Sequence, residues 1–191
     1  MTTIGVLALQ GDFAEHLAAL SKLDIHVREV RLPSELEGID GLIIPGGEST
    51  TMARLMDIYH LRGPIKNRAQ EGMAVWGTCA GLILVASSLE DDRPEPLGLM
   101  DIKVTRNAFG RQVESFEVDL AVTAFQGEPF HAVFIRAPGI QQLQSGVQTL
   151  ANLPDGRVVA ARQGSVLGTS FHPELTEDTR FHQYFLSMVA P

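Results

Sequence analysis

Cys79 lies in a pattern that is typical of a nucleophile on a sharp strand-to-helix turn. The residues Gly77-Thr78-Cys79-Ala80-Gly81 follow one apolar run, 73–76, and lead into another, 80–88. This is the Gly-x-nucleophile-x-Gly elbow with cysteine in place of serine. A Cβ at either glycine would clash with a neighbouring strand or helix, and the helix N-terminus favours a thiolate. The pattern predicts a nucleophilic cysteine, with a tight turn around a buried, inert cysteine as the alternative.

A candidate base for this thiol lies near the other end of the chain. Phe171-His172-Pro173-Glu174 follows the last predicted strand, and Pro173 favours an extended His172. Residues two apart in an extended segment point the same way, so Glu174 is expected to bond the imidazole and fix His172 as base. An ordinary loop histidine is the alternative. His16 has no such neighbours and is expected to be structural or at the surface.

The segment Pro45-Gly46-Gly47-Glu48-Ser49 also follows a predicted strand. Acyl transfer requires two N–H donors directed at the developing oxyanion. Ala80, the residue after the nucleophile, is expected to supply one, and Gly47 the other. A strand-to-helix turn that happens to contain glycines is the alternative.

The elements that must position these segments alternate through the first 90 residues. Apolar runs predict strands over 3–9, 26–32, 41–45 and 73–76, with helices beginning near 12, 49 and 64 and a further helix over 80–88. Such alternation indicates a mostly parallel sheet with helices on both faces. The carboxyl ends of parallel strands meet at one edge of the sheet, which is where ligand sites form.

The second half of the chain has a different pattern. After a surface loop over 91–96, short strands are predicted at 101–106, 115–122, 132–135, 147–151, 157–162 and 166–171, with a hairpin turn at 152–156. A final helix is predicted over 176–189. Because the sequence has neither an internal repeat nor a low-complexity linker, we expect one α/β domain spanning residues 1–191.

Composition narrows the classes of protein. The 191 residues carry a net charge of −8 without a basic cluster, so a nucleic-acid partner is not expected. The single cysteine excludes an intrachain disulfide. The uncharged stretch 73–89 is shorter than a membrane span, and the N-terminal residues have no basic region typical of a signal peptide. We expect a cytoplasmic protein without a membrane partner.

Taken together, the segments at 45–51, 77–81 and 171–174 resemble the class I (triad) glutamine amidotransferases. Leu9-Gln10-Gly11 and the segments 106–112, 134–138 and 170–176 are similar, more specifically, to the glutaminase subunits of pyridoxal 5′-phosphate synthases. The resemblance covers nearly the whole chain. It departs from the family at Ala108, where the family usually has serine, and the change keeps the main chain that this motif presents.

The resemblance implies a flavodoxin-like, doubly wound domain that hydrolyses L-glutamine through Cys79, His172 and Glu174. It implies a partner, a (β/α)8-barrel synthase that receives the ammonia within a large hetero-oligomer, and neither a cofactor nor a metal. Gln10 is similar to the family residue that responds to docking of this partner. The implied glutamine contacts are Gly46, Gly47, Glu48, Ser49, Arg106, Ile135 and Arg136.

Elementary chemistry accounts for three of these contacts without reference to the family. The guanidinium of Arg106 can bind an α-carboxylate bidentately, and the main chain near Ile135 and Arg136 can meet the amino-acid head group. Two other functions remain open. One is a glutaminase of another pathway or a different cysteine hydrolase, such as a peptidase with an open cleft. The other is a non-enzymatic binding protein with an unreactive thiol.

Overall fold

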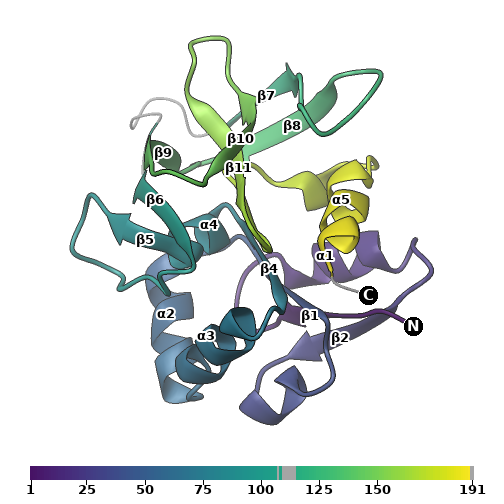
Figure 1. Ribbon diagram of the computed structural model, residues 1–191, viewed down its shortest axis with the longest axis vertical. Helices are drawn as coiled ribbons and strands as arrows, with labels where there is room; N and C mark the ends of the chain where they lie inside the picture. Colours follow the sequence, from purple (N-terminus) through teal and green to yellow (C-terminus); the bar gives the residue numbers. More distant parts are fainter. Residues whose placement is uncertain (107, 109–114, 190–191) are drawn as a thin grey trace.

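A seven-stranded sheet forms the centre of the computed structural model, which describes residues 1–106, 108 and 115–189 (Figure 1). Its spatial order is β10-β11-β12-β4-β3-β1-β2. The parallel strands are β1 (Thr3–Leu7), β2 (His26–Val30), β3 (Gly41–Ile44), β4 (Ala74–Thr78) and β12 (Val166–Thr169). Two antiparallel strands, β11 (Val158–Gln163) and β10 (Gln148–Asn152), extend one edge. The five parallel strands have the 2-1-3-4-5 order of flavodoxin-like folds.

Helices cover both faces of this sheet. The helices α1 (Phe13–Leu20) and α5 (Arg180–Met188) pack on one face, and α2 (Ser49–Ile58), α3 (Arg62–Gln70) and α4 (Ala80–Val85) on the other (Figure 1). Side chains of one strand alternate between the two cores, because Leu42 and Ile44 join the α2–α4 side while Ile43 joins the α1–α5 side. This explains why the strands are continuous apolar runs. The predicted doubly wound α/β fold is confirmed.

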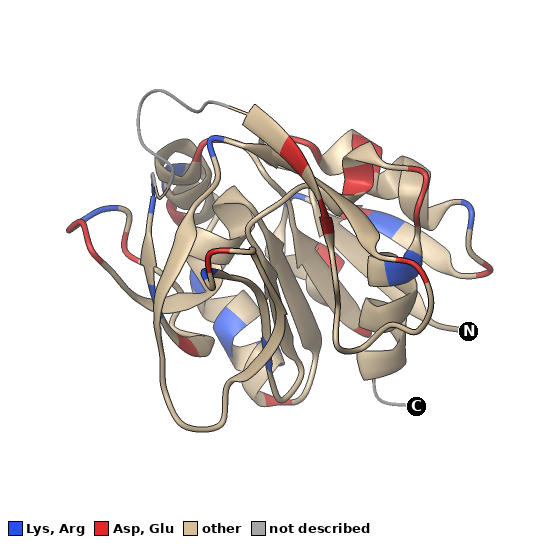
Figure 2. Ribbon diagram, turned by 90° about the horizontal axis from the view of Figure 1, so that it is seen from above, with Lys and Arg blue, Asp and Glu red and all other residues tan. Residues whose placement is uncertain are grey.

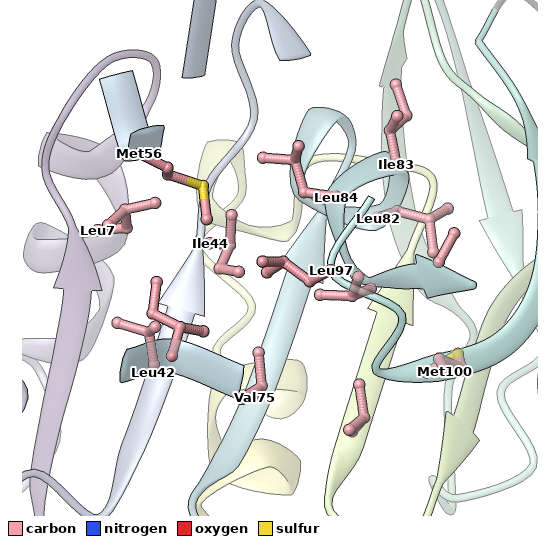
Figure 3. Close-up of a cluster of buried hydrophobic side chains, with 14 of the residues drawn as sticks. Leu7, Leu42, Ile44, Met56, Val75, Leu82, Ile83, Leu84, Leu97 and Met100 are labelled. Atoms are coloured by element: carbon pink, nitrogen blue, oxygen red, sulfur yellow. The ribbon is translucent and has the colours of Figure 1, made fainter. Parts of the chain in front are cut away.

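The core on the α2–α4 side holds the helix that follows Cys79. Figure 3 shows Leu42, Ile44 and Val75 from the strands directed toward Met56 of α2 and Leu84 of α4. All five side chains are fully buried. Each buried aliphatic side chain contributes about 1.5–3 kcal/mol of transfer free energy, so α4 is fixed against the sheet and the turn before it has one position.

Two small sheets lie outside the central sheet. One consists of β5 (Ala86–Leu89), β6 (Met100–Thr105) and β9 (Gly139–Leu143), and the other of β7 (Ser115–Leu120) and β8 (Phe130–Ile135). The predicted hairpin turn lies between β10 and β11, with Gly156 at a φ of +88°. The segment 91–96 contains neither helix nor strand, as predicted.

Two strands differ from the prediction. Residues 86–88, predicted as the end of the helix 80–88, belong to β5 and pair with β6, because an apolar run does not distinguish a buried helix from a strand. The strand β9 was not predicted. Its sequence, Gly-Ile-Gln-Gln-Leu, is half polar, and it is defined by antiparallel pairing with β6.

Helix boundaries also differ from the predicted ones. The last helix begins at Arg180 rather than near 176, because Pro173–Leu175 forms a separate 3-10 turn, η2. A second 3-10 turn, η1 (Pro33–Leu36), follows β2. Glu48 is the N-cap of α2 and bonds its first turn, whereas Asp12, the N-cap of α1, makes no side-chain cap bond. The Glu48 carboxylate accepts from the N–H groups of Thr50 and Thr51.

Lys and Arg are interspersed with Asp and Glu over the ribbon seen in Figure 2. Within the described part of the chain, the helices are all too short or too polar to cross a membrane.

Candidate active site

Cys79 occupies a strained turn between β4 and α4. Its φ is +48°, in the left-handed region, and its N–H donates to Thr169 O on β12 at 2.8 Å. A Cβ on Gly77 would lie 2.3 Å from Gly81 O, and one on Gly81 would lie 1.9 Å from Ile44 O. The structure thus confirms the steric reason for both glycines. At the elbow α4 lies closer to β3 and β4 than any residue larger than glycine at positions 77 and 81 would allow.

Replacement of Gly81 by alanine is expected to destabilise the fold, because the new methyl group meets a main-chain oxygen of β3 that must move. Overpacking of this kind costs about 1–3 kcal/mol, and thermal unfolding measures the loss. The matched control is Gly63→Ala in α3, where a Cβ meets nothing within 4 Å. An unchanged melting temperature for Gly81→Ala would contradict the steric account.

His172 and Glu174 are paired as the sequence predicted, but the backbone conformation that pairs them differs from the predicted one. Nδ1 of His172 lies 2.7 Å from Glu174 Oε1, and the residues are only 3% and 7% exposed. The predicted extended segment was wrong, since His172 (φ −107°, ψ 85°) instead precedes the 3-10 turn Pro173–Leu175. The tight turn folds the carboxylate back onto the imidazole. This geometry fixes the ring orientation of His172.

The charge states of Cys79, His172 and Glu174 depend on one another. Burial opposes the imidazolium, but hydrogen bonds to Cys79 and Glu174 outweigh it and raise the pKa of His172 to about 10. Burial raises the pKa of Glu174, while the hydrogen bond from His172 acts in the opposite direction. An imidazolium between a thiolate and a carboxylate is the charge state that activates a cysteine nucleophile.

His16 lies behind the same carboxylate, a location that sequence reasoning missed. It is fully buried, and its Nε2 lies 3.4 Å from Glu174 Oε2 and 3.1 Å from Thr78 Oγ1. Of the two expectations, a surface position is wrong and a buried, structural one agrees with the structure, but the contact with Glu174 was not predicted. A signal was present, because His16 shares the helical stripe of Ala19 and Leu20, the buried residues of α1.

A cavity of about 200 Å³ opens beside Cys79. Pockets for drug-sized ligands are about 300–1,000 Å³, so this one suits a smaller molecule such as a single amino acid. Its lining residues come from four separate parts of the chain: Gly47, Glu48, Ser49, Cys79, Ala80, Ile83, Arg106, Arg136 and Pro138.

Most of the predicted substrate contacts lie at this cavity, and two lie beside it. Gly46 packs against the triad, since a Cβ there would be 2.4 Å from His172 Cε1. The Ile135 carbonyl accepts a long contact from Cys79 Sγ at 3.7 Å. The motif residues 107 and 109–112 lie outside the described residues.

Arg106 is held at the wall of the cavity by two side chains. Its Nη1 donates to Thr50 Oγ1 at 3.2 Å, and its Nε donates to Asp91 Oδ2 at 3.1 Å. Arg136, at the end of β8, has a φ of +45°. Two arginines therefore line one small cavity, and the guanidinium of Arg106 favours a ligand that carries a carboxylate.

The loop after β1 holds the loop after β3. Gln10 Oε1 accepts from the Glu48 N–H at 2.8 Å, and the Asp12 N–H donates to Gly46 O at 3.1 Å. Gly47 between these bonds has a φ of +145°, which only glycine adopts readily. The two bonds fix the main chain on both sides of Gly47.

Asp12, His172 and Glu174 offer ligand atoms that lie within 4.8 Å of one another. A metal ion there would need the Nδ1 lone pair of His172, but this nitrogen is already bonded to Glu174 Oε1. The arrangement is accounted for by the His172–Glu174 pair without an ion.

Comparison with known sequences decides the family. The profile of the SNO glutamine amidotransferase family matches residues 6–191. The chain belongs to this family. A relative from Herpetosiphon aurantiacus, called pyridoxal 5′-phosphate synthase subunit PdxT, is 56% identical over 189 residues, which cover 97% of this chain and 100% of the relative. A protein of the same name from Roseiflexus sp. is 54% identical over 188 residues, with the same coverage.

Solved structures agree with the assignment to the SNO glutamine amidotransferase family. A crystal structure of a glutamine amidotransferase has a TM-score of 0.92 and 51% identity, covering 97% of this chain and 98% of the other. The structure of PurLQS from Thermotoga maritima has a TM-score of 0.75 at 20% identity, covering 99% of each chain. At that identity the second comparison speaks for the fold alone.

Proposed function

We propose that this chain hydrolyses L-glutamine to L-glutamate and ammonia, with Cys79, His172 and Glu174 as a catalytic triad. The observation that carries the proposal is a buried His172–Glu174 pair beside Cys79, at a small cavity lined by Arg106 and Arg136. Family membership over residues 6–191 supports glutamine as the substrate. We assign residues 1–191 to one class I amidotransferase domain.

In the first half-reaction the Cys79 thiolate attacks Cδ, the carbonyl carbon of the glutamine side-chain amide. Main-chain N–H groups of Ala80 and Gly47 stabilise the oxyanion. The imidazolium of His172 gives its proton to the departing nitrogen, the C–N bond breaks, and ammonia leaves a γ-glutamyl thioester. In the second half-reaction neutral His172 takes a proton from water, the hydroxide displaces the thiolate, and glutamate is released.

The neighbouring residues have supporting roles in this proposal. Glu174 orients His172 and stabilises its charged form. Arg106 binds the α-carboxylate, while the main chain of Ile135 and Arg136 meets the amino-acid head group. The Gly46, Gly47, Glu48 and Ser49 segment closes the other side of the cavity. Neither a metal nor a cofactor has a step in this chemistry.

The relatives named pyridoxal 5′-phosphate synthase subunit PdxT support a destination for the ammonia. We infer that it passes to a (β/α)8-barrel synthase that makes pyridoxal 5′-phosphate, within a large cytoplasmic hetero-oligomer. The decisive experiment is an ammonia assay on free glutamine, with and without the candidate synthase. If ammonia were released but the synthase could not use it, a glutaminase of another pathway would be favoured. If ammonia were not released, a different cysteine hydrolase or a binding protein would be favoured.

Replacement of Arg106 by alanine is expected to raise the Michaelis constant for glutamine with a smaller effect on kcat. The guanidinium binds ground state and transition state alike, and a lost charged hydrogen bond is worth roughly 1.5–3 kcal/mol, or about 10- to 150-fold. Steady-state kinetics with the synthase present measures the change.

Two further variants make this experiment specific. Arg106→Lys keeps the charge but loses the bidentate geometry, so an intermediate Michaelis constant is expected. Arg54→Ala removes an exposed guanidinium on α2 that does not line the cavity, and it should leave the constant unchanged. Unaltered glutamine affinity in Arg106→Ala would move the carboxylate role to the main chain near Ile135.

A further inference from the structure

The second oxygen of Glu174 lacks an evident partner. Oε1 is bonded to His172 Nδ1 at 2.7 Å, whereas Oε2 is buried and makes no hydrogen bond of good geometry to any described residue. The nearest donor is His16 Nε2 at 3.4 Å. Leaving a buried carboxylate oxygen without a donor is costly. The position of His16 therefore requires an explanation beyond packing.

His16 belongs to a buried chain of polar groups on the α1–α5 side of the sheet. Its Nε2 lies 3.1 Å from Thr78 Oγ1, next to the nucleophile, and its Nδ1 lies 3.1 Å from His182 Nε2 on α5. Both histidines are fully buried. Burial, followed by the neighbouring charges of His182 and His172, lowers the pKa of His16, and burial lowers that of His182 to about 4. Both rings are neutral at ordinary pH, so each carries one N–H.

The surroundings select one arrangement of these two hydrogens. If His16 carried its hydrogen on Nδ1, its Nε2 lone pair would face the Glu174 carboxylate, and His182 would need its hydrogen on a buried Nδ1 that has no partner among the described residues. With hydrogen on both Nε2 atoms, His182 donates to His16 Nδ1, and His16 donates toward Thr78 Oγ1 and Glu174 Oε2. The second arrangement gives every buried N–H an acceptor.

We propose that His16 is a positioning residue of the triad, whose Nε2–H, fixed by His182, is shared between Thr78 and Glu174 and holds the carboxylate toward His172. The inference rests on the proposed triad. His16 does not line the cavity, so it acts through its contacts with Glu174 and Thr78. The imidazole of His16, on α1, contacts His182 on α5, Thr78 at the elbow and Glu174 in the 3-10 turn.

A positioning role has a signature in the pH profile. Without the His16 donor the ionised form of Glu174 is less stable, so its pKa rises further, and Glu174 becomes protonated at a higher pH. The acid limb of kcat/KM then moves upward, by about one to two pH units for one hydrogen bond to a charged group. The titratable groups that act on this carboxylate and on His16 are Asp12, His172 and His182, while Cys79 and Lys22 act on His172 and His182 in turn.

Two near-isosteric variants separate the donor from the packing. The amide nitrogen of glutamine reaches about as far as Nε2 of histidine, so His16→Gln retains a donor for Glu174. The amide of asparagine reaches only as far as Nδ1, so His16→Asn retains a polar group toward His182 and loses the donor. We expect the acid limb of His16→Asn to shift upward and that of His16→Gln to remain near wild type, with the Michaelis constant for glutamine unchanged in both. Equal profiles for the two variants would overturn the proposal.

Two measurements do not depend on glutamine turnover. Cys79 is the sole cysteine, so its alkylation by iodoacetamide as a function of pH follows the same shift, because protonation of Glu174 weakens the thiolate–imidazolium pair. Long-range ¹H–¹⁵N NMR of the wild-type chain assigns the imidazole hydrogens and should place both on Nε2. A hydrogen on His16 Nδ1 would refute the proposal even if neither variant folds. Failure of wild type to release ammonia in the presence of the synthase would refute the proposed function instead, while alkylation and NMR would still test His16.

Discussion

Replacement of Cys79 by alanine is expected to abolish ammonia release from glutamine while leaving the fold intact. The side chain is 7% exposed and loses a single sulfur, so thermal unfolding should change little. Loss of a triad nucleophile costs about 10⁶ in kcat, which brings the rate below detection. The measurement is an ammonia assay with the synthase present, alongside a melting curve of the variant.

The other triad positions give graded results that test the assignment. His172→Ala should lose a factor comparable to that of Cys79→Ala, because nucleophile and base act as a unit. Glu174→Gln should lose less, since Glu174 orients and stabilises the imidazole but does not transfer the proton. Residual activity near wild type in Cys79→Ala would remove Cys79 from the mechanism, whatever the other two variants show.

Addition of the synthase is expected to raise glutamine hydrolysis by about 10²- to 10³-fold over the isolated chain. Ammonia made without an acceptor is wasted and becomes protonated in water. A donor subunit therefore benefits from keeping its oxyanion N–H groups misaligned until it docks. Correct placement of one such N–H is worth roughly 10²–10³ in rate.

The loop after β1 is suited to transmit docking. Its Asp12 N–H holds Gly46 O and its Gln10 side chain holds the Glu48 N–H, so displacement of this loop would release both sides of Gly47. Rotation there has little steric cost because Gly47 has no side chain. Removing the Gln10 amide uncouples the two loops in this account.

The measurement compares hydrolysis rates with and without the synthase for wild type, Gln10→Ala and Gln70→Ala. Gln10→Ala should have a smaller activation ratio than wild type, whereas Gln70, exposed at the end of α3, is the matched control and should not matter. Equal rates with and without the synthase would reject gating by the partner and leave the triad untouched.

Local sequence was sufficient for the elbow, the alternation of strands and helices, and the hairpin turn. The two glycines around Cys79 are dictated by contacts within adjacent elements, and the structure shows the predicted clashes with Gly81 O and Ile44 O. The pairing of His172 with Glu174 was also predictable, although the 3-10 turn that produces it was not. Residues that are two apart in sequence lie close together both in an extended segment and in a turn. The His172–Glu174 contact was therefore predicted correctly even though the backbone conformation was not.

Only the tertiary structure decided which distant residues meet at the site. The strands β5 and β9 form because they pair with β6. Their own residue types do not dictate a strand conformation. Arg106, Arg136 and Gly47 line one cavity because β6, β8 and β3 end near the elbow. His16 reaches Glu174 across a separation that no periodicity encodes. A sequence pattern reports which face of an element is buried, whereas the identity of the group it contacts depends on how several elements pack at once.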